Sequence, residues 1–275
     1  MDDGNQRTWP PSYFRFDGGL YTPTGLARSP WDRAAVAGGP ISGLLATCAE
    51  DPLLERDFVI ARYSVDILGK VPHQPLLVEK ETLRDGRQTK LHRICLLADG
   101  RLVAQAHVLR TRKLQTPDFP AAHDYPPPEN VADSEGGNRP SMAGGIRYRT
   151  VLGDVGLPGR AISWIDVRGE MVSGVQASPF VKAALIADFG GGFGNVTRPG
   201  EWSYANLDVT LQLLRMPVGE WLLLDAVTHM AGIGNATAEC TFADRDGVYA
   251  RGFQTIFVAP GSQSTNLPRH AGDRK

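Results

Sequence analysis

The stretch VPHQPLLVEKETL, residues 71–83, is followed by a strand pattern and then by DGRLVAQAHVLR at residues 99–110. The same order recurs later, with MPVGEWLLLDAVT at residues 216–228 and DGVYARGFQTIFV at residues 246–258. The matching prolines are 217 − 72 = 145 positions apart, and the matching Asp-Gly glycines are 247 − 100 = 147 positions apart. A spacing kept to within two residues indicates two copies of one structural unit.

A helix is predicted in front of the strands in each copy. In the first, GGPISGLLATCAED (residues 38–51) begins with Gly-Gly-Pro, and proline is favoured in the first turn of a helix. In the second, SPFVKAALIADF (residues 178–189) begins with a serine cap and a proline, and GGGFGN (residues 190–195) is expected to end the helix. Both segments are small or apolar on nearly all sides, which predicts burial.

After each helix the pattern changes to two-residue alternation, as in residues 58–63 and 221–226. Asp-Gly pairs at residues 85–86, 99–100 and 246–247 favour tight hairpin turns, so the strands are expected to form an antiparallel meander. A helix that is apolar on all sides must be covered on all sides, which predicts a sheet wrapped around it. Two such units would pair edge to edge and remove an exposed edge from each.

The clearest compositional break lies between the two copies, where residues 114–145 are rich in proline, glycine and charge and have no apolar period. We therefore expect an N-terminal unit at residues 1–113, a linker at residues 114–145 and a C-terminal unit at residues 146–260. Residues 261–275 are expected to be a disordered tail.

Composition excludes several classes of protein. The 275 residues include 29 Lys plus Arg and 30 Asp plus Glu, so no overall field favours nucleic acid or an anionic membrane. The N-terminus has no apolar leader and no stretch approaches a membrane span, which predicts a cytoplasmic protein without membrane partners. Cys48, Cys95 and Cys240 are widely spaced and are expected to be buried free thiols.

The sequence also resembles a known family. The string ARYSVDILGKVPHQPLLVEKETLRDGRQTKLHRICLLADGRLVAQAHVLR is similar to the strand meander of the N-terminal hotdog in double-hotdog acyl-CoA thioesterases of type II. ALIADFGGGFGN, NLDVTLQLLRMPVGEWLLLDA and ARGFQTIFV resemble the C-terminal hotdog, so the resemblance spans about residues 13 to 260. It implies an α+β double hotdog, in which two antiparallel sheets each wrap a central helix and join into one continuous sheet.

The resemblance implies a site in the C-terminal hotdog. The helix aspartate of the family corresponds to Asp188, the last-strand glutamine to Gln254, and the strand residue two positions before Asp208 to Asn206. Asn206 departs from the hydroxyl residue usual there; it can orient water but cannot act as a nucleophile. The implied reaction is direct hydrolysis of an acyl thioester, with CoA as part of the substrate and with no cofactor or metal. The backbone N–H groups of Gly38 and Gly39, at a helix N-terminus, are candidates for binding the thioester carbonyl.

The repeat predicts one site per chain. The proline offset matches Asn206 with Ala61, the glycine offset matches Gln254 with His107, and the counterpart of Asp188 falls near residues 41–43, where there is no acid. The first unit is therefore expected to lack the constellation.

Other functions and sites are weaker interpretations. A hotdog hydratase would need a histidine five positions after Asp188, where this chain has Phe193. An enzyme of a biosynthetic pathway acting on a carrier-bound acyl intermediate, or a non-catalytic acyl-CoA-binding protein, stays open because of Asn206. Arg84 and Arg87 beside the Asp85-Gly86 turn are either solvated or contact CoA phosphates. A homo-oligomer is an open expectation, since hotdog relatives commonly associate.

Overall fold

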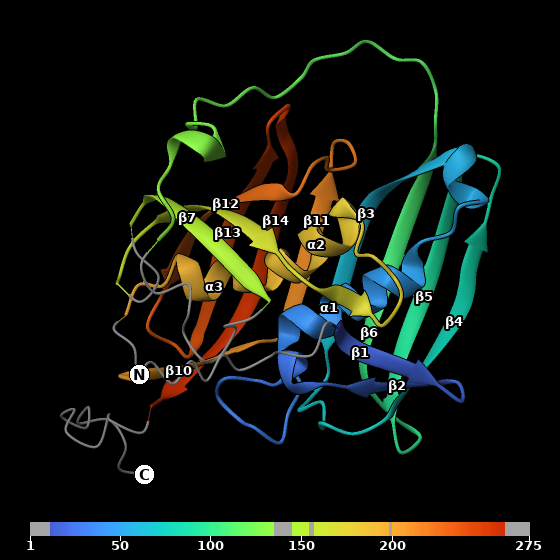
Figure 1. Ribbon diagram of the computed structural model, residues 1–275, viewed down its shortest axis with the longest axis horizontal. Helices are drawn as coiled ribbons and strands as arrows, with labels where there is room; N and C mark the ends of the chain where they lie inside the picture. The colour runs from blue at the N-terminus through green and yellow to red at the C-terminus, as the bar shows by residue number, and fades with distance from the viewer. Residues whose placement is uncertain (1–11, 135–144, 154–156, 198–199, 262–275) are drawn as a thin grey trace, which may run out of the picture.

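The computed structural model describes residues 12–134, 145–153, 157–197 and 200–261 (Figure 1). The predicted tail at residues 261–275 therefore lies outside the described residues except for Gly261. Among the described helices, none is long and apolar enough to cross a membrane.

The first half of the chain forms a set of strands around one long helix. Its elements are β1 (Ser12–Asp17), β2 (Leu20–Pro23), η1 (Gly25–Ala27), α1 (Gly38–Ala49), η2 (Leu54–Arg56), β3 (Phe58–Ile67), β4 (Leu76–Asp85), β5 (Thr89–Ala98) and β6 (Arg101–Arg112).

The second half repeats this order with a broken helix. A short helix, η3 (Pro128–Asn130), comes first. It is followed by β7 (Ile146–Leu152), β8 (Ala161–Val167), β9 (Glu170–Val172), α2 (Pro179–Ile186), η4 (Ala187–Phe189), α3 (Gly190–Phe193), β10 (Trp202–Asn206), β11 (Asp208–Leu213), β12 (Trp221–Met230), β13 (Asn235–Asp244) and β14 (Gly247–Pro260). The run GGGFGN thus extends the helical path by a further turn, where the sequence predicted its end.

The strands that the structure describes form one sheet, in the order β7-β8-β12-β13-β14-β11-β3-β6-β5-β4-β2-β1-β9, with β10 also paired to β14. From the antiparallel β11–β3 junction outward, the order is β11-β14-β13-β12-β8-β7 in one half and β3-β6-β5-β4-β2-β1 in the other. The halves are therefore related by a pseudo-two-fold axis at this junction. The predicted double hotdog is confirmed, with one correction: β1 and β9 pair in parallel.

The register of the hairpins gives the spacing of the repeat. A bulge in the β5–β6 hairpin separates the pair Leu97 and Leu102 from the pair Leu96 and Ala104. The same bulge occurs in the β13–β14 hairpin between Ala243 with Val248 and Phe242 with Ala250. The offset is therefore 243 − 97 = 146 in both strands.

This offset corrects one sequence-based correspondence. The counterpart of Gln254 is residue 254 − 146 = 108, a buried valine, and not His107. The glycine offset was one residue too large because Asp99 and Gly100 occupy the turn of the first hairpin, whereas Arg245 and Asp246 occupy that of the second. A shift of one residue changes the face of a strand, so His107 points away from the helices.

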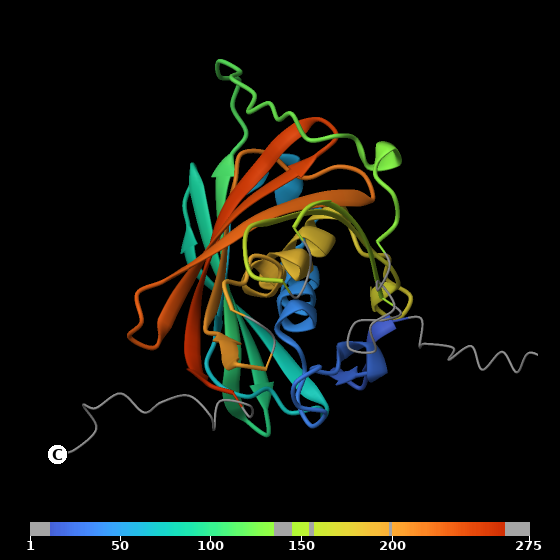
Figure 2. The same ribbon diagram turned by 90° about the vertical axis from the view of Figure 1, so that its left-hand side faces the viewer.

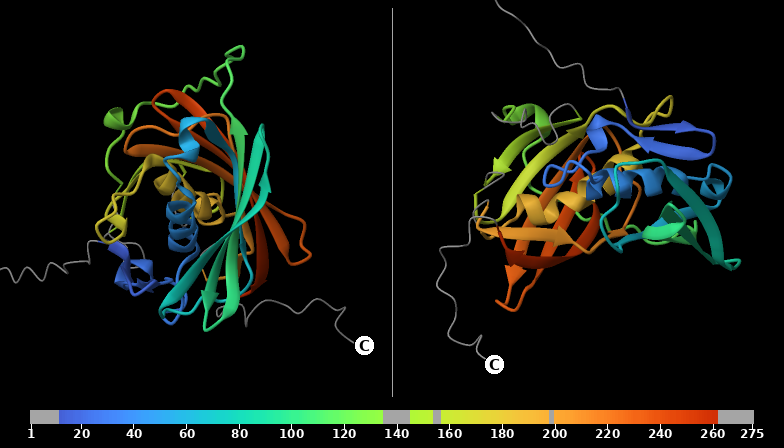
Figure 3. Two further views of the ribbon diagram at one scale, coloured as in Figure 1. Left: turned by 90° about the vertical axis from the view of Figure 1, so that its right-hand side faces the viewer. Right: turned by 90° about the horizontal axis from the view of Figure 1, so that it is seen from below.

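The two helices lie side by side in the interior, inside the curve of the sheet (Figures 2 and 3). They pack closely because α1 carries glycines on the contact face; a methyl group at Gly39 would come to 3.0 Å from the Leu185 carbonyl oxygen of α2. The Ser42 hydroxyl donates to the Ala184 carbonyl at 2.7 Å, and the Tyr63 hydroxyl donates to the Ser42 carbonyl at 2.6 Å. These bonds satisfy buried polar groups and fix one helix against the other.

Part of the proline-rich segment between the halves packs on the outer face of the second half. The Val248 N–H donates to the Ala121 carbonyl at 2.8 Å, and the Trp164 indole N–H donates to the Pro126 carbonyl at 2.8 Å. The Tyr125 hydroxyl donates to Asp225, whose carboxylate also accepts two bonds from Arg160. This cover explains why every residue of β8 is buried although its strand has two faces.

Candidate active site

Asp188 lies at the break between α2 and α3, in the 3-10 turn η4. The turn is held by Gln254 of β14, whose side-chain amide donates to the Ala187 carbonyl at 2.5 Å and accepts from the Gly191 N–H at 2.6 Å. Gln254 is 1% exposed, and both ends of its amide are thereby satisfied. The glutamine therefore sets the backbone on both sides of Asp188.

The glycines after Asp188 let this turn lie directly on the strands. A methyl group at Gly190 would overlap the Cys240 thiol, and one at Gly191 would come within 2.6 Å of the Ile256 side chain. A methyl group at Gly194 would collide with the backbone of Ala226, whereas one at Gly192 would meet nothing within 4 Å. Three of the four glycines in GGGFGN are thus required by close approach.

Asn206 is the last residue of β10 and bonds directly to Asp188. Its side-chain nitrogen donates to the Asp188 Oδ1 and to the Asp188 backbone carbonyl, each at 2.8 Å. Since both donor hydrogens are used in this way, the side-chain oxygen of Asn206 is left as an acceptor. Asp188 and Asn206 are each half-buried, so solvent reaches the pair.

The Asp188 carboxylate also faces the N-terminus of α1, in the other half of the chain. A methyl group at Gly38 would overlap this carboxylate, and the Gly39 N–H donates to it. The next residue, Pro40, has no N–H to offer. The N-cap residue Ala37 makes no side-chain bond to the helix, so the first N–H groups of α1 are open to other acceptors.

Burial raises the pKa of Asp188 to about 6, against the lowering effect of the bonds from Asn206 and Gly39. A carboxylic acid with a pKa near 6 is ionised at pH 7 and binds a proton more strongly than an ordinary aspartate does. This is the property that a general base needs near neutral pH.

The five residues expected from the sequence therefore meet at one place. Asp188 contacts Asn206, Gly38 and Gly39 directly, while Gln254 contacts the backbone around Asp188 and not its carboxylate. Sequence reasoning missed the part played by Gly190 and Gly191. The run of three glycines that begins two residues after Asp188 was the signal that could have found it.

The opposite end of the helix pair holds a second acid. The two helices run antiparallel, so Glu50, after the last turn of α1, lies beside the N-terminus of α2, where the Ser178 hydroxyl donates to its carboxylate at 2.5 Å. Burial raises the pKa of Glu50 as well. The counterpart of Asp188 is therefore Glu50, and the sequence-based match to residues 41–43 is wrong because it transferred a strand offset to the helices.

Arg110 of β6 lies near this second acid and is fully buried. Its guanidinium donates to the Ala49 carbonyl at 2.5 Å and contacts the His92 ring at 3.2 Å. It thus bonds the end of α1 as Gln254 bonds the end of α2.

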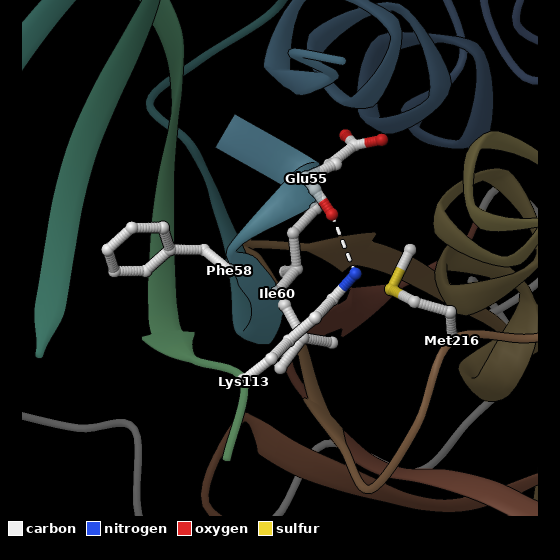
Figure 4. A pocket seen from close by; sticks show the side chains of 6 residues that line it. Glu55, Phe58, Ile60, Lys113 and Met216 are labelled. Atoms are coloured by element: carbon white, nitrogen blue, oxygen red, sulfur yellow. Dashed lines mark hydrogen bonds between the residues drawn. The ribbon is translucent and has the colours of Figure 1, made fainter. Parts of the chain in front are cut away.

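A small pocket of about 170 Å³ lies between the start of β3, the end of β6 and Met216 (Figure 4). At its rim the Lys113 ammonium donates to the Glu55 carbonyl at 2.6 Å. None of the five proposed site residues lines it. Within the described ranges, no group of three or more His, Cys, Asp or Glu side chains is arranged to hold a metal ion.

Comparison with known proteins connects this geometry to an activity. The family model of the acyl-CoA thioesterase C-terminal domain matches residues 117–258, and that of the acyl-CoA thioesterase N-terminal domain matches residues 27–111. No curated protein sequence matches the chain.

Solved structures share the fold at low identity. Acyl-CoA thioesterase II TesB2 from Mycobacterium marinum is 17% identical with a TM-score of 0.64, and covers 90% of this chain and 95% of its own. A tesB protein from Mycobacterium avium subs paratuberculosis is 18% identical with a TM-score of 0.63, covering 90% and 96%. A hot dog fold protein of unknown function from Alicyclobacillus acidocaldarius is 16% identical with a TM-score of 0.69, covering 90% and 95%.

Proposed function

The chain belongs to the acyl-CoA thioesterase family and is a thioesterase, and from this premise we propose that Asp188, Asn206 and Gln254 form its catalytic site. The reaction proposed is hydrolysis of an acyl-CoA without a cofactor. The single observation that carries this assignment is geometric: the Asp188 carboxylate, on a half-buried residue, is bonded to Asn206 and seated against the N-terminus of α1 in the other half of the chain.

In the proposed mechanism, Asp188 is the general base. A water molecule bound between its carboxylate and the side-chain oxygen of Asn206 gives up a proton to Asp188 as its oxygen attacks the thioester carbonyl carbon. The carbon–sulfur bond then breaks, and the proton held by Asp188 passes to the departing thiolate. The products are a carboxylic acid and free CoA.

The developing oxyanion needs a fixed donor. The Gly39 N–H serves the Asp188 carboxylate, and Pro40 has none, which leaves the Gly38 N–H for the substrate carbonyl. The α1 dipole favours negative charge at this point. Glycine is required because a side chain at residue 38 would occupy the space of the Asp188 carboxylate.

Gln254 acts as a positioning residue in this proposal. Direct contact with the water, which the family resemblance implied, would depend on the one amide hydrogen and the one oxygen lone pair that these two backbone bonds leave over. Loss of the amide would instead free the Ala187 carbonyl and the Gly191 N–H and let the turn that carries Asp188 move.

The test is release of free thiol from a panel of acyl-CoA chain lengths. Wild-type enzyme is expected to turn over at least one chain length, Asp188→Asn to lose nearly all of this activity, and Gln254→Ala to lose most of it. If both variants hydrolyse acyl-CoA at the wild-type rate, the proposed site is wrong. Tight acyl-CoA binding without thiol release by the wild type would contradict hydrolysis of acyl-CoA itself.

A further inference from the structure

The segment between η1 and α1, residues 28–36, is a closed loop that carries an exposed tryptophan, and we name it the Trp31 loop. The side chain of Trp31 is 85% exposed. An exposed indole offers a flat ligand one of the largest apolar surfaces that a side chain can present.

Hydrogen bonds within the loop hold the backbone that presents Trp31. Its ends pair as a bridge between Arg28 and Val36, and the Ser29 N–H donates to the Ala35 carbonyl at 2.9 Å. The Ser29 hydroxyl accepts from the Trp31 and Asp32 N–H groups at 3.2 and 3.3 Å. A loop whose backbone is held in this way loses little conformational entropy when a flat ligand stacks on its tryptophan.

The same loop carries two arginines. Arg28 and Arg33 are exposed, and Arg28 donates to the Arg33 carbonyl at 2.7 Å, which holds the two residues together. Lys70 adds a third cation and pairs with Asp32 at 2.5 Å, leaving two uncompensated positive charges. Within the described part of the chain, the Arg33 guanidinium has no ion-pair or hydrogen-bond partner.

The loop leads directly to the proposed site. It ends at the N-cap of α1, and the next residue, Gly38, touches Asp188. Ala37 stands six positions after Trp31, so the Cα atom of Trp31 lies at most about 21 Å from that of the helix N-cap. The pantetheine arm of CoA has a comparable reach. Figure 1 shows this blue segment as a loop at the lower edge of the molecule.

We propose that the Trp31 loop binds the nucleotide end of CoA, with the adenine stacked on Trp31 and the phosphates paired with Arg28 and Arg33. This rests on the proposed function and names the carrier that its substrate bears. A base stacks on an aromatic ring while guanidinium groups bind phosphate oxygens in a forked geometry. An indole with two free cations fits one nucleotide better than the broad acidic surface of a carrier protein.

The alternative phosphate contacts suggested by the sequence, Arg84 and Arg87, lie at the wrong end of the molecule. They flank the β4–β5 turn, and β5 begins just after it at Thr89. Thr89 pairs with Thr111 of β6, and Thr111 also pairs with Val59 at the start of β3. Since β3 starts soon after α1 ends, this turn is near the C-terminal end of α1 and far from Gly38.

The test compares two substrates, acyl-CoA and the same acyl group on pantetheine, which lacks the nucleotide. We expect Trp31→Ala and Arg33→Ala each to raise the KM for acyl-CoA by about tenfold, as loss of one stacked base implies. The kcat for acyl-CoA and the KM for acyl-pantetheine should not change. Trp31→Phe should recover most of the affinity, and Arg87→Ala is the matched control at the opposite end.

Several outcomes would overturn the proposal. Unchanged KM for acyl-CoA in both variants would do so, as would an equal rise with both substrates. Faster turnover of an acyl-carrier protein that is lost in Trp31→Ala would assign the loop to protein recognition instead. If the wild type released no thiol at all, the proposed function would fail, and the loop would then be tested alone by quenching of Trp31 fluorescence with adenosine 3′,5′-bisphosphate, using Trp31→Phe as the blank.

Discussion

The two ends of the buried helix pair differ in how the facing helix begins. At one end Asp188 meets α1, whose N-cap Ala37 makes no side-chain bond and whose first residues are glycines. At the other end Glu50 meets α2, whose N-cap Ser178 bonds the Val181 N–H and is followed by Pro179, which has no N–H. The first end has the backbone N–H groups of both Gly38 and Gly39 beside its acid, whereas at the second end the proline removes one N–H and the Ser178 hydroxyl takes another, so duplication of the fold does not duplicate the chemistry.

The strands differ in the same direction. The second half presents Asn206 and Gln254 to its helix, whereas the first half has an apolar residue, Val108, at the position of Gln254. Its Arg110 fixes the end of α1 and is fully buried, which leaves it no room to contact a substrate. The first half thus retains the support of the helix end without an amide side chain at the position of Gln254.

The largest expected effect comes from a comparison of variants at the two acids, Asp188 and Glu50. Asp188→Asn should reduce kcat/KM for acyl-CoA by about 10²–10⁴-fold, because the general base is lost. Glu50→Gln, the matched change at the other end, should leave kcat/KM unchanged. Equal losses in both variants, measured by thiol release with folding checked by circular dichroism, would show that the two ends share the chemistry.

The second prediction concerns the helix start that faces Asp188. Gly38→Ala should lower kcat by about 100-fold, because the methyl group displaces the carboxylate and blocks the carbonyl site. Gly192→Ala places the same group in open space and serves as the control. A Gly38→Ala enzyme with wild-type kcat would rule out this N-terminus as the binding point for the thioester.

The third prediction is a pH profile. Since burial raises the pKa of Asp188 to about 6, kcat/KM should be constant above about pH 7 and fall about tenfold per pH unit below about pH 6, where the base is protonated. Glu50→Gln should give the same curve. A wild-type profile that stays flat to pH 5 would remove Asp188 from the role of base.

The smallest expected effect is on stability. A carboxyl group whose pKa is raised on folding stabilises the fold when protonated, and this contribution is lost as the pH rises through about 6. The free energy of unfolding of Asp188→Asn should therefore exceed that of the wild type by about 1 kcal/mol at pH 8, a figure that allows for the partial exposure of residue 188. At pH 4 the two proteins should be equally stable. Urea denaturation at the two pH values measures it; a loss of stability at pH 8 would mean that the ionised carboxylate is well solvated.

Much of the fold could be predicted from the sequence, because both copies of the repeat contain clear local patterns of secondary structure. The Asp-Gly turns, the alternation of the strands and the two apolar helices each report a local preference, and together they predicted two units in which an antiparallel sheet wraps a helix. The family resemblance identified this arrangement as a double hotdog. The parallel pairing of β1 with β9 could not be predicted, because it joins Ser12 to Glu170 across the whole chain.

The site followed from the family resemblance more than from the residues alone. Asp188 could be singled out as an acid in an apolar helix, but its contact with Gly38 depends on the antiparallel packing of two distant helices. The pairing of Glu50 with Ser178 was missed for the same reason, since helices and strands of the repeat are offset by different numbers of residues. The bonds from Gln254 to the backbone could not be predicted, because they form at the break between α2 and α3. The glycines after Asp188 indicated the end of a helix and not a break within it.

The most direct test of one active end per chain is a binding titration. Isothermal titration calorimetry with a non-hydrolysable acyl-CoA thioether, on the wild type and on Gly38→Ala and Glu50→Gln, gives the number of sites per chain. We predict one site in the wild type, one in Glu50→Gln, and strongly weakened binding in Gly38→Ala. Two equivalent sites per chain in the wild type, or one that survives Gly38→Ala and disappears in Glu50→Gln, would contradict the account.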